Sequence, residues 1–179
     1  MPDAPDLSDI FVARSRGYLG DEYRVKIRRA VEALPPDALW WRPHDQANSA
    51  GNLLLHLAGN VRQWIVSGVG GAPDARWRAG EFEARGGEDA AALLARLDAT
   101  LDEADAVLAA LTPPRLAERV TIQGRDVTVL DAVYHVVEHF ALHLGQLILL
   151  AKQLAPGSVR FYEDAGGLAR PLWRDAAAD

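Results

Sequence analysis

The stretch from Thr128 to Leu154 constrains the fold most strongly, because its apolar residues recur at helical spacing along its whole length. These residues form one face of the predicted helix: Val133, Val137, Phe140, Leu144, Leu147 and Ile148. A helix with one apolar face is stable when that face packs against other elements. The rest of the chain therefore has to supply partners for this helix.

Three earlier segments have the same periodicity. The first runs from Ser8, placed as an N-cap, to about Leu34, and Pro35-Pro36 ends it. The second runs from Ser49 to the glycines that follow Gly68, and the third from about Glu88 to Leu111. Four amphipathic helices with short or medium connections predict an all-α protein, an antiparallel four-helix bundle.

The connections carry further signals. Trp40 and Trp41 are predicted to close one end of the core, with lining of a substrate pocket as the alternative. Residues 71–87 indicate a solvated loop, although their charged and aromatic residues would also suit a lid or the wall of an active site. The alternation in 119–129 around Gln123-Gly124 predicts a short β-hairpin.

The length of 179 residues predicts one domain over 1–179, with a bundle core at about 8–155 and a tail at 156–179 packed on it. The net charge of −6 disfavours nucleic acid and anionic lipid as partners. The first residues lack the pattern of a signal peptide, and no uninterrupted apolar run approaches the roughly 18 residues of a membrane span. We expect a cytoplasmic protein that does not bind membranes.

Histidine and carboxylate side chains are the candidates for chemistry, because the chain has no cysteine. His135, His139 and His143 are each four residues from the next and share one stripe of the last helix. Neighbouring pairs in this stripe can bind one metal ion, but about 12 Å of helix rise separates the outer two. A complete site therefore needs a ligand from another element, and His56 lies on the polar flank of the second helix.

At these residues the chain resembles the DinB/YfiT-like superfamily of small four-helix bundles with a three-histidine site for a divalent metal. The resemblance rests on Leu55-His56-Leu57, on Trp41-Arg42-Pro43, and on the last-helix segment His139-Phe-Ala-Leu-His143-Leu-Gly-Gln146. It covers most of residues 8–155. It implies His56, His139 and His143 as the metal ligands.

The resemblance also implies chemistry. Relatives with known activity are thiol-dependent transferases and isomerases that use a low-molecular-weight thiol as cosubstrate, and the superfamily implies homodimers. Gln146 would orient a ligand or line the site, Gly145 would allow close helix approach, and His135 would be a pocket residue. Glu138 or His135 would assist proton transfer to or from the small-molecule substrate. Imidazoles suit zinc, nickel, iron and copper, of which we expect zinc or nickel.

Two alternatives remain open from the sequence. His135-Val-Val-Glu138-His139 matches the HxxEH motif of inverted zinc proteases, in which both histidines bind zinc and the glutamate activates water. The other alternative is a non-catalytic dimeric bundle that binds a metal or a small molecule.

Overall fold

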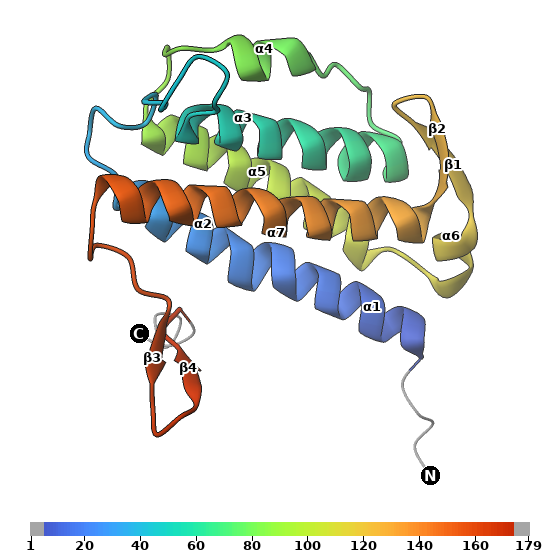
Figure 1. Ribbon diagram of the computed structural model, residues 1–179. Coiled ribbons are helices and arrows are strands. Elements are labelled where there is room, and N and C mark those ends of the chain that lie inside the picture. The colour runs from blue at the N-terminus through green and yellow to red at the C-terminus, as the bar shows by residue number, and fades with distance from the viewer. Residues whose placement is uncertain (1–5, 174–179) are drawn as a thin grey trace.

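The computed structural model describes residues 6–173, and the ends of the predicted domain, residues 1–5 and 174–179, lie outside this range. Four long helical segments form a bundle, in which α7 packs on α3 and α2, and α5, behind α7 in the view of Figure 1, packs on α3 and on the segment of α1 and α2. The segments are α1 Leu7–Arg16, η1 Gly17–Tyr23 and α2 Arg24–Glu32; α3 Ala50–Val61 and η2 Arg62–Val69; α5 Ala90–Ala109; and α7 Val129–Leu154. The predicted all-α bundle is confirmed.

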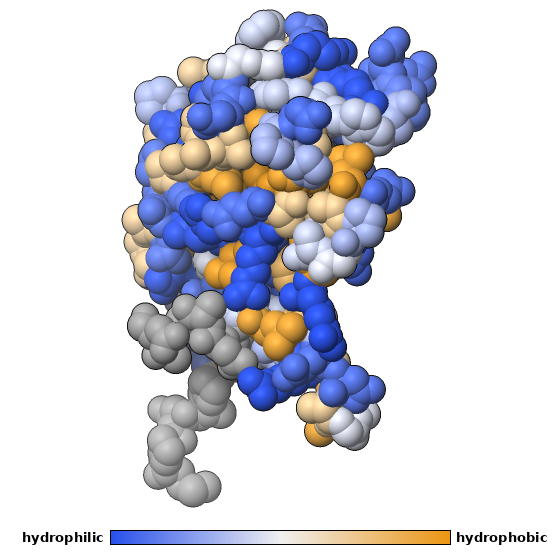
Figure 2. All heavy atoms as spheres, turned by 90° about the vertical axis from the view of Figure 1, so that its left-hand side faces the viewer, coloured by the Kyte–Doolittle hydropathy of each residue, from blue (hydrophilic) through white to orange (hydrophobic). Residues whose placement is uncertain are grey.

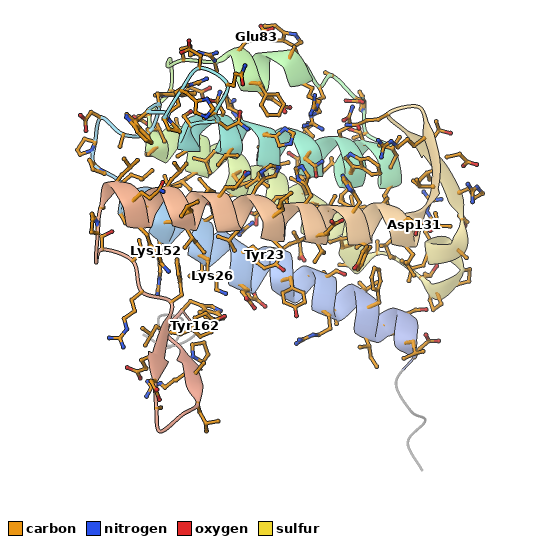
Figure 3. The ribbon with its side chains drawn as sticks, in the orientation of Figure 1. Tyr23, Lys26, Glu83, Asp131, Lys152 and Tyr162 are labelled. Atoms are coloured by element: carbon orange, nitrogen blue, oxygen red, sulfur yellow. The ribbon has the colours of Figure 1, made fainter. Side chains whose placement is uncertain are left out.

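Helix starts follow local capping chemistry. The first helix begins after Asp6 rather than Ser8, because the Asp6 carboxylate accepts a hydrogen bond from the Ser8 backbone N–H at 2.7 Å. Ser49 caps α3 as predicted and forms a capping box with Asn52. Thr128 and Asp131 form the equivalent box at the start of α7, where Figure 3 labels Asp131.

Two of the long segments contain π-helical turns. Gly17 and Gly20, which weakened the helical pattern of the first segment, lie in η1. The second π-helical segment, η2, continues α3 without a break and places Gln63 and Trp64 directly after it. Both predicted helices are therefore continuous, with wider turns inside them.

The connections contain more helix than the sequence indicated. Residues 71–87 include the short helix α4 Arg78–Glu83, and a second short helix, α6 Pro113–Ala117, follows the predicted break at Thr112. The solvated-loop interpretation of 71–87 is wrong at Glu81, whose residue is only 8% exposed. Packing against α3 gives this segment its structure, which local propensity did not reveal.

The predicted hairpin is confirmed. Strands β1 Arg119–Ile122 and β2 Arg125–Thr128 pair antiparallel, with Val120 opposite Val127. Gln123 and Gly124 both have positive φ angles, of 53° and 73°, as a two-residue hairpin turn requires. A second antiparallel pair, β3 Tyr162–Asp164 and β4 Ala169–Pro171, lies in the tail.

The described part of the tail packs on α2. Lys26 is buried, its ammonium lies 3.6 Å from the centroid of the Trp173 ring, and its Nζ is 2.6 Å from Glu22. Figure 3 shows Lys26 on α2 near Tyr162 of β3, whose hydroxyl is 3.3 Å from Nζ. Trp173 is 6% exposed. These contacts attach the described part of the tail to α2.

Tryptophan and glycine residues show in more detail where the chain is closely packed. Trp40 lies flat on Gly51, where an added Cβ would come within 2.8 Å of the indole, and its Nε1–H donates to the Glu88 carbonyl. Trp41 is 41% exposed and is not part of the core end. Gly145 was expected to allow close helix approach, but it is exposed and an added Cβ there would meet no atom within 4 Å. Close approach occurs at Gly51 and Gly59 instead.

Helix α7 is long and apolar enough on average to cross a membrane, and it is the one such helix in residues 6–173. This differs from the expectation drawn from uninterrupted apolar runs. One apolar face, which includes Phe140, is buried against the other helices, and histidines occupy the adjoining side. A core helix of a bundle passes the same test, so α7 is only weak evidence for a membrane span.

Candidate metal centre

Helices α3 and α7 run antiparallel, and three histidines meet between them. His56 comes from α3, whereas His139 and His143 come from successive turns of α7. The Nε2 atom of His139 lies 3.0 Å from that of His56 and 3.1 Å from that of His143. The candidate ligand atoms of the three residues all lie within 4.8 Å of one another. Three ring nitrogens therefore point at one common position.

Two of these rings are oriented by acceptors on their other nitrogen. The Nδ1–H of His56 donates to Glu81 Oε2 at 2.8 Å, and the Nδ1–H of His143 donates to Gln146 Oε1 at 2.7 Å. A proton on Nδ1 leaves the Nε2 lone pair of a neutral imidazole free. Partners of this kind fix the tautomer and ring angle of metal-binding histidines.

Glu81 is itself held by a buried ion pair. Arg76 donates from Nε to Oε1 at 2.7 Å and from Nη2 to Oε2 at 2.8 Å, which is a bidentate arrangement. The side chains of Arg76 and Glu81 are 4% and 9% exposed. Arg76 also donates to Gln63 Oε1 at 3.0 Å, and Gln63 donates to Asp74 at 2.7 Å. A chain of polar contacts thus runs from His56 to the surface.

The α4 segment reaches the histidines because α3 leaves space for it. An added Cβ at Gly59 would come within 2.0 Å of Glu81 Oε1, so a larger residue would displace the carboxylate. Asn52 is fully buried and donates to the backbone carbonyls of Glu81 and Ala84 at 2.8 and 3.0 Å. Arg42 donates to both Asn52 and the Ala84 carbonyl. These contacts fix the backbone that carries Glu81.

The electrostatic environment lowers the pKa values of His139 and His143. Burial, followed by the nearby His143 and His56, lowers the pKa of His139 from 6.5 to about 3. Burial also lowers the pKa of His143, although its hydrogen bond to Gln146 opposes this effect. Burial would raise the pKa of Glu81, but the hydrogen bonds from Arg76 and His56 outweigh it and lower that pKa. These shifts favour a charged carboxylate at Glu81 and neutral imidazoles at His139 and His143.

The donor set fits a divalent metal ion. With Nδ1 protonated, His56 and His143 both turn Nε2 lone pairs toward His139, whose Nε2 can donate a single proton. The lone pairs of at least two neighbouring Nε2 atoms would then face and repel each other. A cation bound among the three nitrogens would remove this repulsion. Zinc–nitrogen bonds of about 2.0–2.1 Å place tetrahedral ligands roughly 3.3 Å apart. The two spacings from His139, 3.0 and 3.1 Å, need little change to reach that value.

The other candidates from the sequence lie around this group. Gln146 contacts His143, as an orienting residue would. His135 lies one turn away: its ring centroid is 5.5 Å from that of His139 and 4.2 Å from that of Trp64, with the Trp64 ring tilted by 44° to it. Burial lowers the pKa of His135. Glu138 is exposed, and no hydrogen bond or ion pair within residues 6–173 involves it.

Sequence reasoning did not find Glu81, Arg76 or Asn52 as site residues. The charged and aromatic character of 71–87 was the available signal, and the lid or wall alternative was the better interpretation of it. The polar flank of α3, which includes Asn52, was noticed without a role. Phe82, beside Glu81, completes the wall, with its ring centroid 4.7 Å from that of His56.

Comparisons with known proteins agree with this architecture. The sequence model of the DinB superfamily matches residues 21–147. A solved structure of a DinB-like protein, YjoA from Bacillus subtilis, is similar with a TM-score of 0.62 and 18% identity, over 85% of this chain and 99% of that chain. At this identity the likeness concerns the fold. A search of curated proteins found no match.

Proposed function

Since the chain belongs to the DinB superfamily, we propose that it binds a divalent metal ion through His56, His139 and His143 and that it is a metal-dependent enzyme. The observation that carries the proposal is the convergence of three ring nitrogens, with a carboxylate and an amide orienting two of the rings. Three imidazoles leave coordination positions for further ligands, as in catalytic rather than structural sites. We expect zinc or nickel.

The proposed reaction class is thiol-dependent transfer or isomerisation of a small-molecule substrate, with a low-molecular-weight thiol as cosubstrate. The ion would supply Lewis acidity, which lowers the pKa of a bound thiol toward neutrality. The chain has no cysteine of its own, so the nucleophilic sulfur would come from the cosubstrate.

The surrounding residues would divide the remaining work. Glu81 holds the His56 Nδ1 proton and raises the basicity of that ring, while Gln146 keeps the His143 ring turned toward the site. The positive charge of Arg76 balances the negative charge of the Glu81 carboxylate and stabilises its ionised form. Of the two proton acceptors expected from the sequence, His135 is half-buried with its ring centroid 5.5 Å from that of His139, whereas Glu138 is exposed, and we propose His135 as the base that takes the thiol proton.

The same geometry argues against an HxxEH hydrolase. That motif needs His135 and His139 on one ion with Glu138 beside it. Here His139 turns its Nε2 toward His56 and His143, His135 lies against Trp64, and Glu138 is exposed. The favoured ligand set is therefore the one that excludes His135.

We also propose that the protein is a homodimer. Tyr134, Leu142 and Leu149 share one face of α7 and are 61%, 61% and 56% exposed, which is a large apolar contribution from one helix. Figure 2 views the end of the bundle where α7 finishes and shows apolar side chains grouped between polar ones. A cytoplasmic location, without membrane or nucleic-acid partners, completes the proposal.

Elemental analysis of the purified, untagged protein tests the metal site. We expect about one equivalent of a transition metal in the native chain. His139→Ala and His143→Ala should lose it, whereas His135→Ala should keep it. His44→Ala is the matched control, since His44 is exposed and belongs to the loop before α3. Loss of metal in His135→Ala but not in His143→Ala would reinstate the HxxEH arrangement.

Thiol use needs a separate measurement. The cobalt-substituted protein should develop a sulfur-to-metal charge-transfer band when cysteine or glutathione is added at neutral pH. A protein that binds cobalt but develops no such band with these or other cysteine-derived thiols is better described as the non-catalytic dimeric bundle. A native protein that stays free of metal after incubation with zinc and nickel contradicts both versions of the proposal.

A further inference from the structure

Unpartnered polar atoms cluster where α3 and η2 face α7. Within residues 6–173, five buried side-chain nitrogen or oxygen atoms have no hydrogen-bond partner. Three of them belong to this seam: Asn60 Oδ1, Trp64 Nε1 and His139 Nδ1. Asn60 and Trp64 are each 3% exposed, so neither side chain is satisfied by bulk solvent.

All three residues are neighbours of His135. The Asn60 Nδ2 atom lies 3.5 Å from His135 Nε2, which is the outer limit for a hydrogen bond. The Trp64 and His139 rings have centroids 4.2 and 5.5 Å from that of His135. Asn60 is also one helical turn beyond His56, and therefore on the same side of α3 as a metal ligand.

The three atoms are chemically complementary. A histidine that gives Nε2 to a metal carries its proton on Nδ1, so His139 Nδ1 becomes a donor, and the indole nitrogen of Trp64 is always one. The Asn60 oxygen is an acceptor with two lone pairs, and it is the sole acceptor among the five unpartnered atoms of residues 6–173. The seam thus holds two donors and one acceptor able to serve both.

Among the three proposed ligands, His139 is the one whose second nitrogen has no acceptor. His56 has Glu81 and His143 has Gln146 in that position. Metal-binding histidines almost always donate from the nitrogen that does not bind the metal. His139 Nδ1 lacks an acceptor and Asn60 Oδ1 lacks a donor, and both atoms lie in the same seam.

We propose that Asn60 is the positioning residue of His139, and that its side-chain oxygen accepts the His139 Nδ1–H when Nε2 binds a metal ion. The terminal torsion of asparagine is soft, so the amide can turn its oxygen toward His139 without moving the backbone. The weak 3.5 Å contact with His135 is the only hydrogen bond of the side chain that this turn gives up. The inference rests on the proposed metal site.

Metal affinity tests the inference with two variants of similar volume. Asn60→Leu removes the acceptor, and Asn60→Asp keeps it. Competition with a chelator should show about 10–100-fold weaker zinc binding for Asn60→Leu. Asn60→Asp should bind zinc at least as tightly as the native protein. Thr100→Val is the control, because Thr100 is also buried, lies on α5 and bonds only to its own helix.

Nitrogen-15 labelling of histidine supplies a readout that a merely structural role would not move. The zinc-loaded native protein should show a slowly exchanging His139 Nδ1–H proton that is retained in Asn60→Asp and lost to exchange in Asn60→Leu. If Asn60→Leu does not fold, the native protein and Asn60→Asp still decide the matter through this resonance. Equal zinc affinity in native and Asn60→Leu proteins, or a rapidly exchanging proton in the native protein, overturns the inference. Absence of zinc binding by the native protein would instead refute the proposed function.

Discussion

Replacing Glu81 with glutamine tests whether the buried ion pair holds the α4 segment against the bundle. Glutamine keeps the volume but removes the charge, which leaves the Arg76 guanidinium, 4% exposed, without a counter-ion. Breaking a buried pair from one side costs about 3–5 kcal/mol, since the remaining charge stays out of water. We expect a loss of that size in the unfolding free energy of the metal-free protein.

The structure also predicts the effect of replacing Arg76, the ion-pair partner of Glu81. Arg76→Met leaves a carboxylate that retains a single donor side chain, His56, and should cost a similar amount. The double variant removes both charges and should recover most of the loss, because two neutral side chains carry no desolvation penalty. The corresponding coupling energy is at least about 4 kcal/mol, which is above the range of about 0.5–3 kcal/mol usual for residues in contact.

Urea unfolding followed by circular dichroism, with a chelator present and near neutral pH, measures all four proteins. Arg62→Met serves as a control, because Arg62 pairs with Glu103 at the surface and both side chains are about half exposed. Such pairs contribute about 0–1 kcal/mol. Single losses below about 1 kcal/mol that add in the double variant would match a surface pair. That result would refute the reasoning that ties α4 to the site through a buried charge.

Two further predictions concern acid and the tail. The metal-free protein should lose stability as the pH falls from about 6.5 toward 3. The pKa values of His135, His139 and His143 are lowered in the folded protein, so in this range the unfolded chain binds protons that the folded chain does not. The urea midpoint should decline less across this range in His139→Gln than in the native protein. Trp173→Ala should cost about 3–5 kcal/mol of unfolding free energy, and Lys26→Met about 1–2 kcal/mol, because the buried indole covers the ammonium. Equal stability of Trp173→Ala and native protein in urea would show that the tail does not contribute to the stability of the fold.

The fold was predictable because its signals are local. The apolar period of α7, the caps at Ser49 and Thr128 and the Gln123-Gly124 turn each depend on a few neighbouring residues, and all are observed. The N-cap of the first helix was misplaced by two residues because aspartate and serine, at 6 and 8, are both good caps. Helix ends depend on small differences of this kind.

The site was predictable only in part. His139 and His143 are brought together by one helix, so their spacing in the sequence reveals their proximity. Glu81 reaches His56 through tertiary packing across 25 residues, and no periodicity connects the two. Gly145 illustrates the opposite failure, since a glycine beside a histidine motif suggested helix contact yet faces open space.

The contact between Gly59 and Glu81 has a consequence for comparing related sequences. The two residues are far apart in the chain, yet a side chain at the first position and a carboxylate at the second would occupy the same volume. They are therefore expected to covary among relatives: a chain with a bulkier residue at the equivalent of 59 must orient its α3 histidine by some other acceptor. This single glycine offers a simple marker for dividing the superfamily by how the α3 ligand is supported.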